Sequence, residues 1–407
     1  MTPQRIIFTA LLPFASGYFM SYLLRAVNAV VAPDLVKDVG LSPAQLGLLT
    51  AAYLGAFALF QLPLGVLLDR YGPRKVQAGL LSVAALGCLT FAFAPGFIGL
   101  FAARAVIGLG FSAGLMASYK SSATWVPIER RSLANTAIMA VGALGVVVAT
   151  EPTEYLVSLI GWRNTFAVFA GVIMLAVILI LVAAPRNDTV GAPAPLRQQF
   201  GQMLAIIKLP LFWRVAPLLG FTSGVQIGIQ TLWAGPWLRD VMGYSREEVA
   251  RHLLFMALAF MLGILSVGII ADRLGRRGIG PVQVLLGFNV IYFIAQALIV
   301  FRVGPLMFPA WLAVAAFGQV AILAFPWFAA HIGKDLAGRA NATINFAMFV
   351  VAFATQYLVG LIIGLFPASA SGYSPDGYSW AIGLFLVAQL AAFIWYLASS
   401  PHKERMQ

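Results

Sequence analysis

Gly65-Val-Leu-Leu-Asp-Arg-Tyr-Gly-Pro-Arg-Lys75 recurs in the second half of the chain as Gly268-Ile-Ile-Ala-Asp-Arg-Leu-Gly-Arg-Arg277. A second pair of segments matches at a similar offset, because Leu133-Ala-Asn-Thr-Ala-Ile138 is similar to Arg339-Ala-Asn-Ala-Thr-Ile344. Self-similarity at a fixed offset indicates a duplicated structural unit. The sequence therefore predicts two parallel halves, each with the quoted motif between corresponding helices.

The composition places both halves in a membrane. Of the 407 residues 61% are hydrophobic and 10% charged, whereas soluble proteins carry about 25% charged residues. Twelve charge-poor stretches are each long enough to cross a hydrocarbon core of about 30 Å, and they are too long for barrel strands. The predicted fold class is an all-α membrane protein with twelve transmembrane helices in two six-helix bundles. The expected spans are 7–31, 44–68, 77–95, 98–126, 134–157, 164–184, 211–238, 248–271, 280–301, 307–331, 341–365 and 379–398.

The longest stretch that cannot span the membrane is 185–210, which is rich in Pro and polar residues. The predicted domains are an N-terminal bundle over 1–184, a cytoplasmic linker over 185–210 and a C-terminal bundle over 211–407. With the N-terminus inside, cytoplasmic segments hold 16 of the 26 Lys and Arg residues, as the positive-inside rule requires. Both termini are thus expected in the cytoplasm, in a multi-pass protein of the bacterial inner membrane.

Several functional classes are excluded. The net charge of +12 follows from loop topology, so nucleic acid is not an expected partner. The only cysteine is Cys88, in the third helix, which excludes an intrachain disulfide and a multi-cysteine metal site. Without a nucleotide-binding loop or a Ser/His/Asp grouping, no enzyme, cofactor or metal is expected. The expected partners are a small solute, membrane lipid and a coupling ion, and the chain is expected to be a monomer.

Arg25 lies inside the first long apolar helix. A cation in hydrocarbon costs roughly 3 kcal/mol or more, so such a residue usually faces a polar cavity. At 3.6 residues per turn Tyr18, Ser21, Arg25 and Asn28 share one stripe, which predicts a cavity wall. The alternatives are an Arg that reaches a membrane surface and one that pairs with an internal acid.

A second polar stripe lies in the seventh helix. Gln226, Gln230 and Trp233 share a face there, and the repeat carries Arg25 onto the region of Gln230, so the two stripes are predicted to face each other. Asn345 in the eleventh helix is a further candidate for the solute site, with helix–helix hydrogen bonding as the alternative.

Other candidates are charged or aromatic. Lys120, after Tyr119 in the fourth helix, brings a second cation to the cavity or else reaches the headgroups; Tyr119 forms a cavity wall or packs in the core. Glu151 and Glu154 near the outer end of the fifth helix are candidates for proton coupling, as is His331. The alternatives are an outer vestibule for the two acids and the surface for His331.

The motif Gly-x-x-x-Asp-Arg-x-Gly-x-Arg, present twice, resembles the signature loop of the major facilitator superfamily. Within that superfamily the chain resembles the anion:cation symporter family and, next, the organophosphate:phosphate antiporters. The segments that carry this likeness are Arg25-Ala-Val-Asn28 with Ala32-Pro-Asp34, Trp125-Val-Pro-Ile-Glu-Arg130 and Leu232-Trp-Ala-Gly-Pro-Trp-Leu238. The resemblance implies that Arg25 holds the anionic group of a substrate.

The chain departs from both families. Where the symporters commonly carry acids for proton coupling, it has Leu24 and Gly110-Phe-Ser-Ala-Gly114. Where the phosphate antiporters carry a second arginine, it has Gln226 and Gln230. These departures weigh against the usual proton acceptors and against a paired-arginine clamp for phosphate.

The resemblance also implies a role in gating for the repeated loops, which would latch the inner gate against the starts of helices eleven and five, around Asn341 and Asn135. Arg104 is similar to part of a fourth-helix motif credited with proton relay or with helix packing. The residues assigned to gating are Asp69, Arg70, Arg74, Asp272, Arg273, Arg277, Glu129 and Arg130.

Taken together, the patterns predict a secondary transporter that moves a small organic anion such as a carboxylate by alternating access, with proton coupling. A uniporter or an exchanger is an alternative mode. Efflux of an amphipathic or sugar-like compound would make Arg25 structural. A membrane receptor that has kept the fold and lost flux is the third alternative.

Overall fold

The computed structural model describes residues 7–186, 196–333, 336–368 and 372–399, and within these ranges it contains helices and no β-strand. The first half comprises η1 (Ile7–Leu11), α2 (Leu12–Ala26), α3 (Asn28–Val39), α4 (Pro43–Phe93), α5 (Phe97–Phe111), α6 (Gly114–Trp125), η2 (Ile128–Arg130), α7 (Arg131–Val148) and α8 (Glu151–Ala183). Helix α9 (Leu196–Ile207) follows. The second half comprises α10 (Pro210–Gly228), η3 (Ile229–Trp233), α11 (Ala234–Met242), α12 (Arg246–Gly275), α13 (Pro281–Val300), η4 (Gly304–Leu306), α14 (Met307–Phe317), η5 (Val320–Leu323), α15 (Ala324–Ile332), α16 (Ala337–Gly364) and α17 (Pro375–Ala398).

These helices account for twelve crossings. Ten helices in the described ranges are long and apolar enough to span a membrane, and the bent run Phe200–Ile207 with Pro210–Met242 adds an eleventh. The twelfth is hidden in α4, whose 51 residues are too many for one crossing. The chain reverses there at Gly72, with φ 75° and ψ 162°, a conformation that glycine adopts without strain. The predicted fold class is confirmed.

The internal repeat extends to the helix caps. Gly40 and Gly243 end α3 and α11 in the left-handed conformation, each at φ 71°. Two residues later Ser42 and Ser245 cap α4 and α12, and each forms a capping box with the third residue of its helix. These pairs stand at the same offset as Gly65 and Gly268 in the quoted motif. The second helix of each half is therefore started by the same local chemistry.

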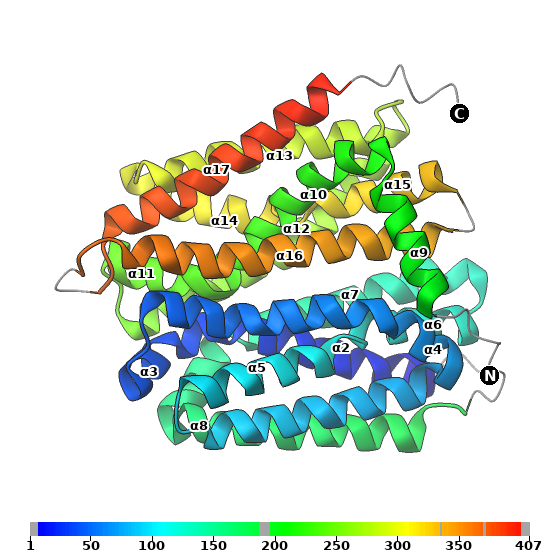
Figure 1. The fold of residues 1–407 in the computed structure, drawn as a ribbon, viewed down its shortest axis with the longest axis horizontal. Helices are drawn as coiled ribbons and strands as arrows, with labels where there is room; N and C mark the ends of the chain where they lie inside the picture. The colour runs from blue at the N-terminus through cyan, green and yellow to red at the C-terminus, as the bar shows by residue number, and fades with distance from the viewer. Residues whose placement is uncertain (1–6, 187–195, 334–335, 369–371, 400–407) are drawn as a thin grey trace.

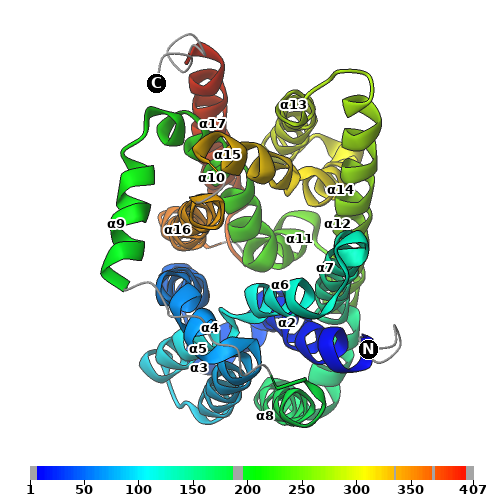
Figure 2. The ribbon, with the colours of Figure 1, turned by 90° about the vertical axis from the view of Figure 1, so that its right-hand side faces the viewer.

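Figure 1 shows the two halves side by side, with the first half below and the second above. Helix α9 lies across one end of both, as Figure 2 also shows, and it falls within the segment 185–210 predicted as a linker. Residues 187–195 of that segment and the tail 402–407 lie outside the described residues. We call this end the α9 end and the opposite end, where α3 and α11 lie, the Arg246 end.

The halves touch closely at the Arg246 end. A Cβ atom at Gly235 of α11 would lie 2.1 Å from the carbonyl oxygen of Ala29 in α3. A Cβ atom at Gly47 of α4 would lie 2.5 Å from the carbonyl oxygen of Gln356 in α16. Small residues let helix backbones approach in this way. At the α9 end, by contrast, a groove of about 290 Å³ separates Asp69 and Lys120 from Arg339 of α16. The molecule is thus closed at one end and grooved at the other.

Closure at the Arg246 end should fail when Gly235 gains a side chain. Gly235→Ala puts a methyl group into the Ala29 carbonyl, so the two halves must separate there. We expect spin labels at Lys37 and Glu247, both exposed at this end, to move apart by several ångströms in the average distance measured by electron paramagnetic resonance. Gly287→Ala is the matched control, because a Cβ atom there meets nothing within 4 Å. An unchanged distance in the Gly235 variant would contradict the close approach.

Candidate functional site

A cavity of about 60 Å³ lies between the halves. The first half supplies Tyr22, Arg25, Ala26, Ala29, Val30, Val146 and Thr150, and the second supplies Gln226, Ile227, Gln230, Thr231, Leu253, Met256, Phe260 and Gln319. The two predicted stripes therefore meet in part, through Arg25 on one side and Gln226 and Gln230 on the other. Because both halves line the cavity, relative motion of the halves would change its access.

Arg25 is 8% exposed and is surrounded by aromatic rings. Its guanidinium carbon lies 4.8 Å from the ring centre of Tyr22, and 5.1 Å from those of Phe57 and Phe349. Ring faces attract a cation without neutralising it. Arg25 Nε has no hydrogen-bond partner, and no ion pair recorded among the described residues includes Arg25. Its positive charge is therefore available to a molecule in the cavity.

Opposite Arg25, three glutamines form a chain of hydrogen bonds. Gln319 Nε2 donates to Gln226 Oε1 at 2.5 Å, and Gln226 Nε2 donates to Gln230 Oε1. Gln319 is not among the residues predicted from the sequence to line the cavity. The signal for it was the pair Gly318-Gln319 inside an apolar stretch, where the tenth crossing is interrupted between α14 and η5. Gly318 is required there, since a Cβ atom would lie 2.0 Å from Gln226 Cγ.

Three members of the predicted stripe on the first crossing do not line the cavity. Tyr18 packs on Tyr22 with ring centres 5.0 Å apart. Ser21 Oγ lies 3.2 Å from the hydroxyl of Tyr53, and Asn28 is fully buried. Helical spacing places these residues near one face, but neighbouring helices cover all of that face except around Arg25.

Trp233 is also buried away from the cavity, and its Nε1 donates to the carbonyl oxygen of Gln356 at 3.0 Å. The reason is that η3 is a π-helix, which has more than 3.6 residues per turn. A spacing of 3.6 residues per turn therefore predicts correctly that Gln226 and Gln230 line the cavity, but it predicts the wrong position for Trp233. Tyr119 packs beside Tyr18 and Ile138, and Asn345 is not among the lining residues.

Lys120 lies at the α9 end, where its Nζ is 2.5 Å from Asp69 Oδ1 and 2.9 Å from the carbonyl oxygen of Leu68. It lines the groove and not the central cavity. Asp272 pairs at 2.9 Å with Arg276, the residue that follows the end of α12. Both aspartates thus pair within their own half.

The arginines of the first repeated loop also make contacts within the first half. Arg74 Nη2 donates to the carbonyl oxygen of Leu181, and Arg70 lies over the ring of Tyr71. The other residues assigned to gating are exposed, namely Glu129, Arg130, Arg273 and Arg277.

The residues considered for proton coupling are widely separated. Arg104 is fully buried in the first half, donates to the carbonyl oxygen of Leu24 at 3.1 Å and lies over Tyr53, which is a packing environment. His331 is exposed and packs on Trp327. Glu151 is half-buried. Among these four only Glu154 forms an ion pair in the described residues.

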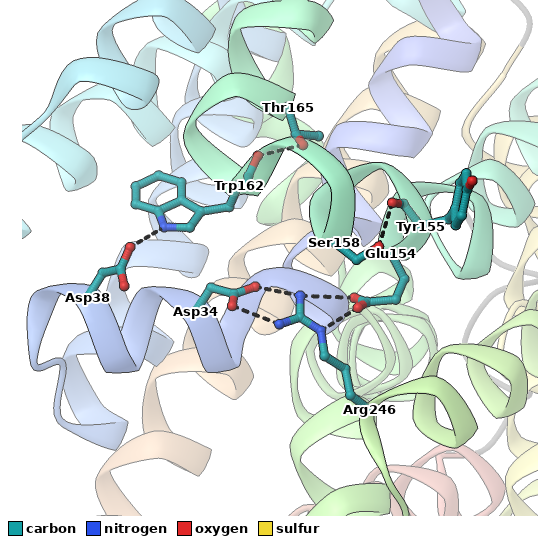
Figure 3. A network of polar contacts seen from close by, with 9 residues as sticks. Asp34, Asp38, Glu154, Tyr155, Ser158, Trp162, Thr165 and Arg246 are labelled. Atoms are coloured by element: carbon teal, nitrogen blue, oxygen red, sulfur yellow. Dashed lines mark hydrogen bonds and ion pairs between the residues drawn. The ribbon is translucent and has the colours of Figure 1, made fainter.

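Glu154 belongs to a three-residue cluster that joins the halves at the Arg246 end (Figure 3). Arg246 at the start of α12 donates to both oxygens of Asp34, Nη1 to Oδ1 at 2.8 Å and Nη2 to Oδ2 at 2.7 Å. It also donates to Glu154, from Nη2 to Oε2 at 3.2 Å and from Nε to Oε1. We call Asp34, Glu154 and Arg246 the clamp. Planar two-point pairing of this kind fixes geometry as well as charge.

The clamp lies at the Arg246 end of the molecule, next to the central cavity. Behind it lies a space of about 90 Å³ that shares Ala29 and Val30 with the Arg25 cavity and is also lined by Arg239. Nearby, Trp162 Nε1 donates to Asp38 Oδ2 at 2.7 Å and ties α3 to α8 within the first half (Figure 3). Glu154 and the Ala32-Pro-Asp34 segment stand out in the sequence, but no sequence pattern links them to Arg246.

Known proteins resemble this chain over most of its length. It is 24% identical over 309 residues to a protein of Cupriavidus necator named "Probable sulfoacetate transporter", covering 72% of this chain and 70% of that one. It is 23% identical over 380 residues to the hexuronate transporter of Escherichia coli strain K12, covering 88% and 87%. Both names describe transporters of organic anions and not enzymes, which confirms the predicted kinship with anion transporters.

Solved structures show the same fold. A bacterial homologue of the human lysosomal transporter Spinster, in an inward-facing and unoccupied conformation, superposes with a TM-score of 0.77 at 17% identity, covering 100% of this chain and 99% of that one. Residues 14–355 match the family described as the Major Facilitator Superfamily. Since that match spans well over half of the sequence, the chain is a multi-pass membrane transporter that belongs to the Major Facilitator Superfamily.

Proposed function

We propose that this protein is a secondary active transporter of a small organic anion, and that Arg25 holds the anionic group between the two halves. The observation that carries the proposal is the cation itself, buried at the interface of the halves and paired with no acid among the described residues. An unpaired buried charge is costly, and an anionic ligand would offset that cost. The organic anions named for the two relatives support the same class of solute.

The proposed orientation places the α9 end in the cytoplasm of a bacterial inner membrane. The loops at that end carry Arg70, Arg74, Lys75, Arg130 and Arg276, which the positive-inside rule assigns to the cytoplasm. Both termini then lie inside, and residues 1–184 and 211–407 act as the two moving bodies. In this orientation the structure represents a state closed to the outside and grooved on the inside.

Transport in this proposal alternates between two arrangements of the halves. Opening to the outside requires the clamp to break, which separates Arg246 from Asp34 and Glu154 and lets water reach both carboxylates. Closing the inside requires α16 to approach Asp69 across the groove, so that this aspartate exchanges Lys120 for a contact with the other half. The Arg246 end and the α9 end cannot both be closed at once, because a rigid-body rotation of one half against the other that closes one end opens the opposite end.

We further propose that transport is coupled to protons and that Glu154 is the residue that accepts the proton. The clamp contains two carboxylates for one guanidinium, so one negative charge remains uncompensated. Protonation of one carboxylate removes that excess and weakens the attachment of Arg246. A proton from outside would therefore favour opening of the clamp, and binding of an anion at Arg25 would follow.

Removal of Arg25 should weaken the binding of organic anions strongly. Arg25→Ala deletes a charge-assisted contact worth about 1.5–3 kcal/mol, so affinity for organic anions should fall at least tenfold in isothermal titration. Arg25→Lys should fail nearly as badly, because an ammonium does not reproduce the planar fork of a guanidinium. Arg251→Ala, at an exposed arginine of α12, is the control and should bind normally. Normal transport by Arg25→Ala would refute the proposed site.

The role of Glu154 predicts a change in pH dependence. Glu154→Gln keeps a hydrogen-bond acceptor for Arg246 and removes the titrating group, so uptake into proteoliposomes should lose its stimulation by an inward proton gradient. Exchange of labelled for unlabelled solute should persist, since exchange needs no net proton movement. Glu151→Gln, one turn away, should behave like the parent. A Glu154 variant that still responds fully to the gradient would assign coupling elsewhere.

A further inference from the structure

We infer that the central cavity selects a short organic monoanion whose body carries few or no hydroxyl groups, such as an unsubstituted carboxylate or sulfonate, over a polyhydroxylated sugar acid. This inference rests on the proposed function, in which Arg25 holds the anionic group. It goes further by assigning the body of the solute from the chemistry of the remaining walls.

The walls around Arg25 are mainly apolar. They include Ala26, Val30, Val146, Leu253, Met256 and Phe260, drawn from both halves. None of these side chains can donate or accept a conventional hydrogen bond. An apolar solute body gives up no hydrogen bond to water when it contacts these walls. Each hydroxyl group that contacts them loses its hydrogen bonds to water.

The polar groups in the cavity are largely committed to other protein groups. The hydroxyl of Thr150 donates to the carbonyl oxygen of Val147 at 2.6 Å. The hydroxyl of Thr231 donates to Ile227 at 2.6 Å and accepts from Gln356 Nε2 at 2.8 Å. Gln226 is occupied on both sides of its amide.

The polar groups that remain in the cavity wall are the two ends of the glutamine chain, the amide nitrogen of Gln230 and the amide oxygen of Gln319, together with the hydroxyl of Tyr22. These three groups suit at most about three polar atoms on the body of the solute. A sugar acid brings four or more hydroxyl groups besides its carboxylate. Each buried hydroxyl left without a partner lowers affinity by roughly tenfold, so such a solute is strongly disfavoured.

Charge and size point the same way. Among the described residues that line the cavity Arg25 alone is charged, so one negative charge on the solute is matched and a second is not. The cavity volume of about 60 Å³ is less than half of the roughly 150 Å³ that holds benzene in an engineered cavity. A body of a few carbon atoms therefore fits best.

The test is a binding panel on the purified full-length protein, measured by isothermal titration. The probes are butyrate and ethanesulfonate as short monoanions, glucuronate and galactonate as sugar acids, sulfoacetate as a short dianion, and butyramide as the uncharged analogue of butyrate. We expect at least one of the short monoanions to bind tenfold or more tightly than either sugar acid and sulfoacetate, and butyramide to show no binding.

Two failures are distinguishable. If no anion binds, or if Arg25→Ala binds the panel as the parent does, the proposed function fails. If anions bind through Arg25 but a sugar acid or the dianion binds as tightly as the short monoanions, the proposed function stands and the inference about the body of the solute is wrong.

A substitution in the wall provides a second measurement. Met256→Gln replaces an apolar wall residue with an amide of similar size, so the preference for butyrate over glucuronate should shrink several-fold. Met261→Gln makes the same change on the same helix at a residue that does not line the cavity, and it should leave the preference unchanged. An equal preference in both variants and the parent would show that the apolar wall does not set selectivity.

Discussion

The rest of this structure depends on one constraint, a guanidinium in the middle of an apolar protein that pairs with no carboxylate in the part of the chain that the structure describes. A cation in such surroundings is tolerated when something other than an acid moderates its charge. Here the faces of Tyr22, Phe57 and Phe349 surround Arg25, and they come from both halves. The aromatic surroundings attract the charge without cancelling it. The site is thereby kept ready for an anion, and its integrity depends on how the halves are placed.

The backbone around the cavity follows from the same constraint. Inside a membrane, irregular backbone is tolerated where protein or a cavity supplies partners for its polar groups. The first, seventh and tenth crossings are all interrupted beside the cavity, at Val27, along η3 and at Gly318-Gln319. Gln230 of η3 and Gln319 of the tenth crossing line the same cavity as Arg25 and bond in series through Gln226 of α10. Glycine at 318 makes room for Gln226, so backbone shape and side-chain chemistry are matched at this point.

The two ends of the molecule differ in the kind of contact that joins the halves. At the Arg246 end the contact combines close backbone approach at Gly235 with the charge pairs of the clamp. Charged groups at such an interface can separate into water without leaving an unsatisfied group in hydrocarbon, so the contact is reversible. At the α9 end the repeated aspartates pair inside their own halves, and a groove remains. An interface of this composition suits motion of one half against the other.

Hydropathy and repetition sufficed to predict twelve crossings in two halves, because spanning helices need long apolar runs and the duplicated loops mark equivalent turns. Arg25 and the glutamines of the seventh crossing were also predictable, since one polar side chain in an apolar helix is conspicuous. Gln319 and the pairing of Arg246 with Asp34 were not, because they join residues about 90 to 210 positions apart. Trp233 was misplaced because helical spacing assumes 3.6 residues per turn, and the π-helix of η3 breaks that assumption. Lys120 was misplaced because only the packed bundle brings Asp69 within its reach. The sequence by itself thus determined which segments cross the membrane and which buried cation stands out. The tertiary structure alone decided which side chains face that cation, because packing between distant helices settles which part of each face stays uncovered.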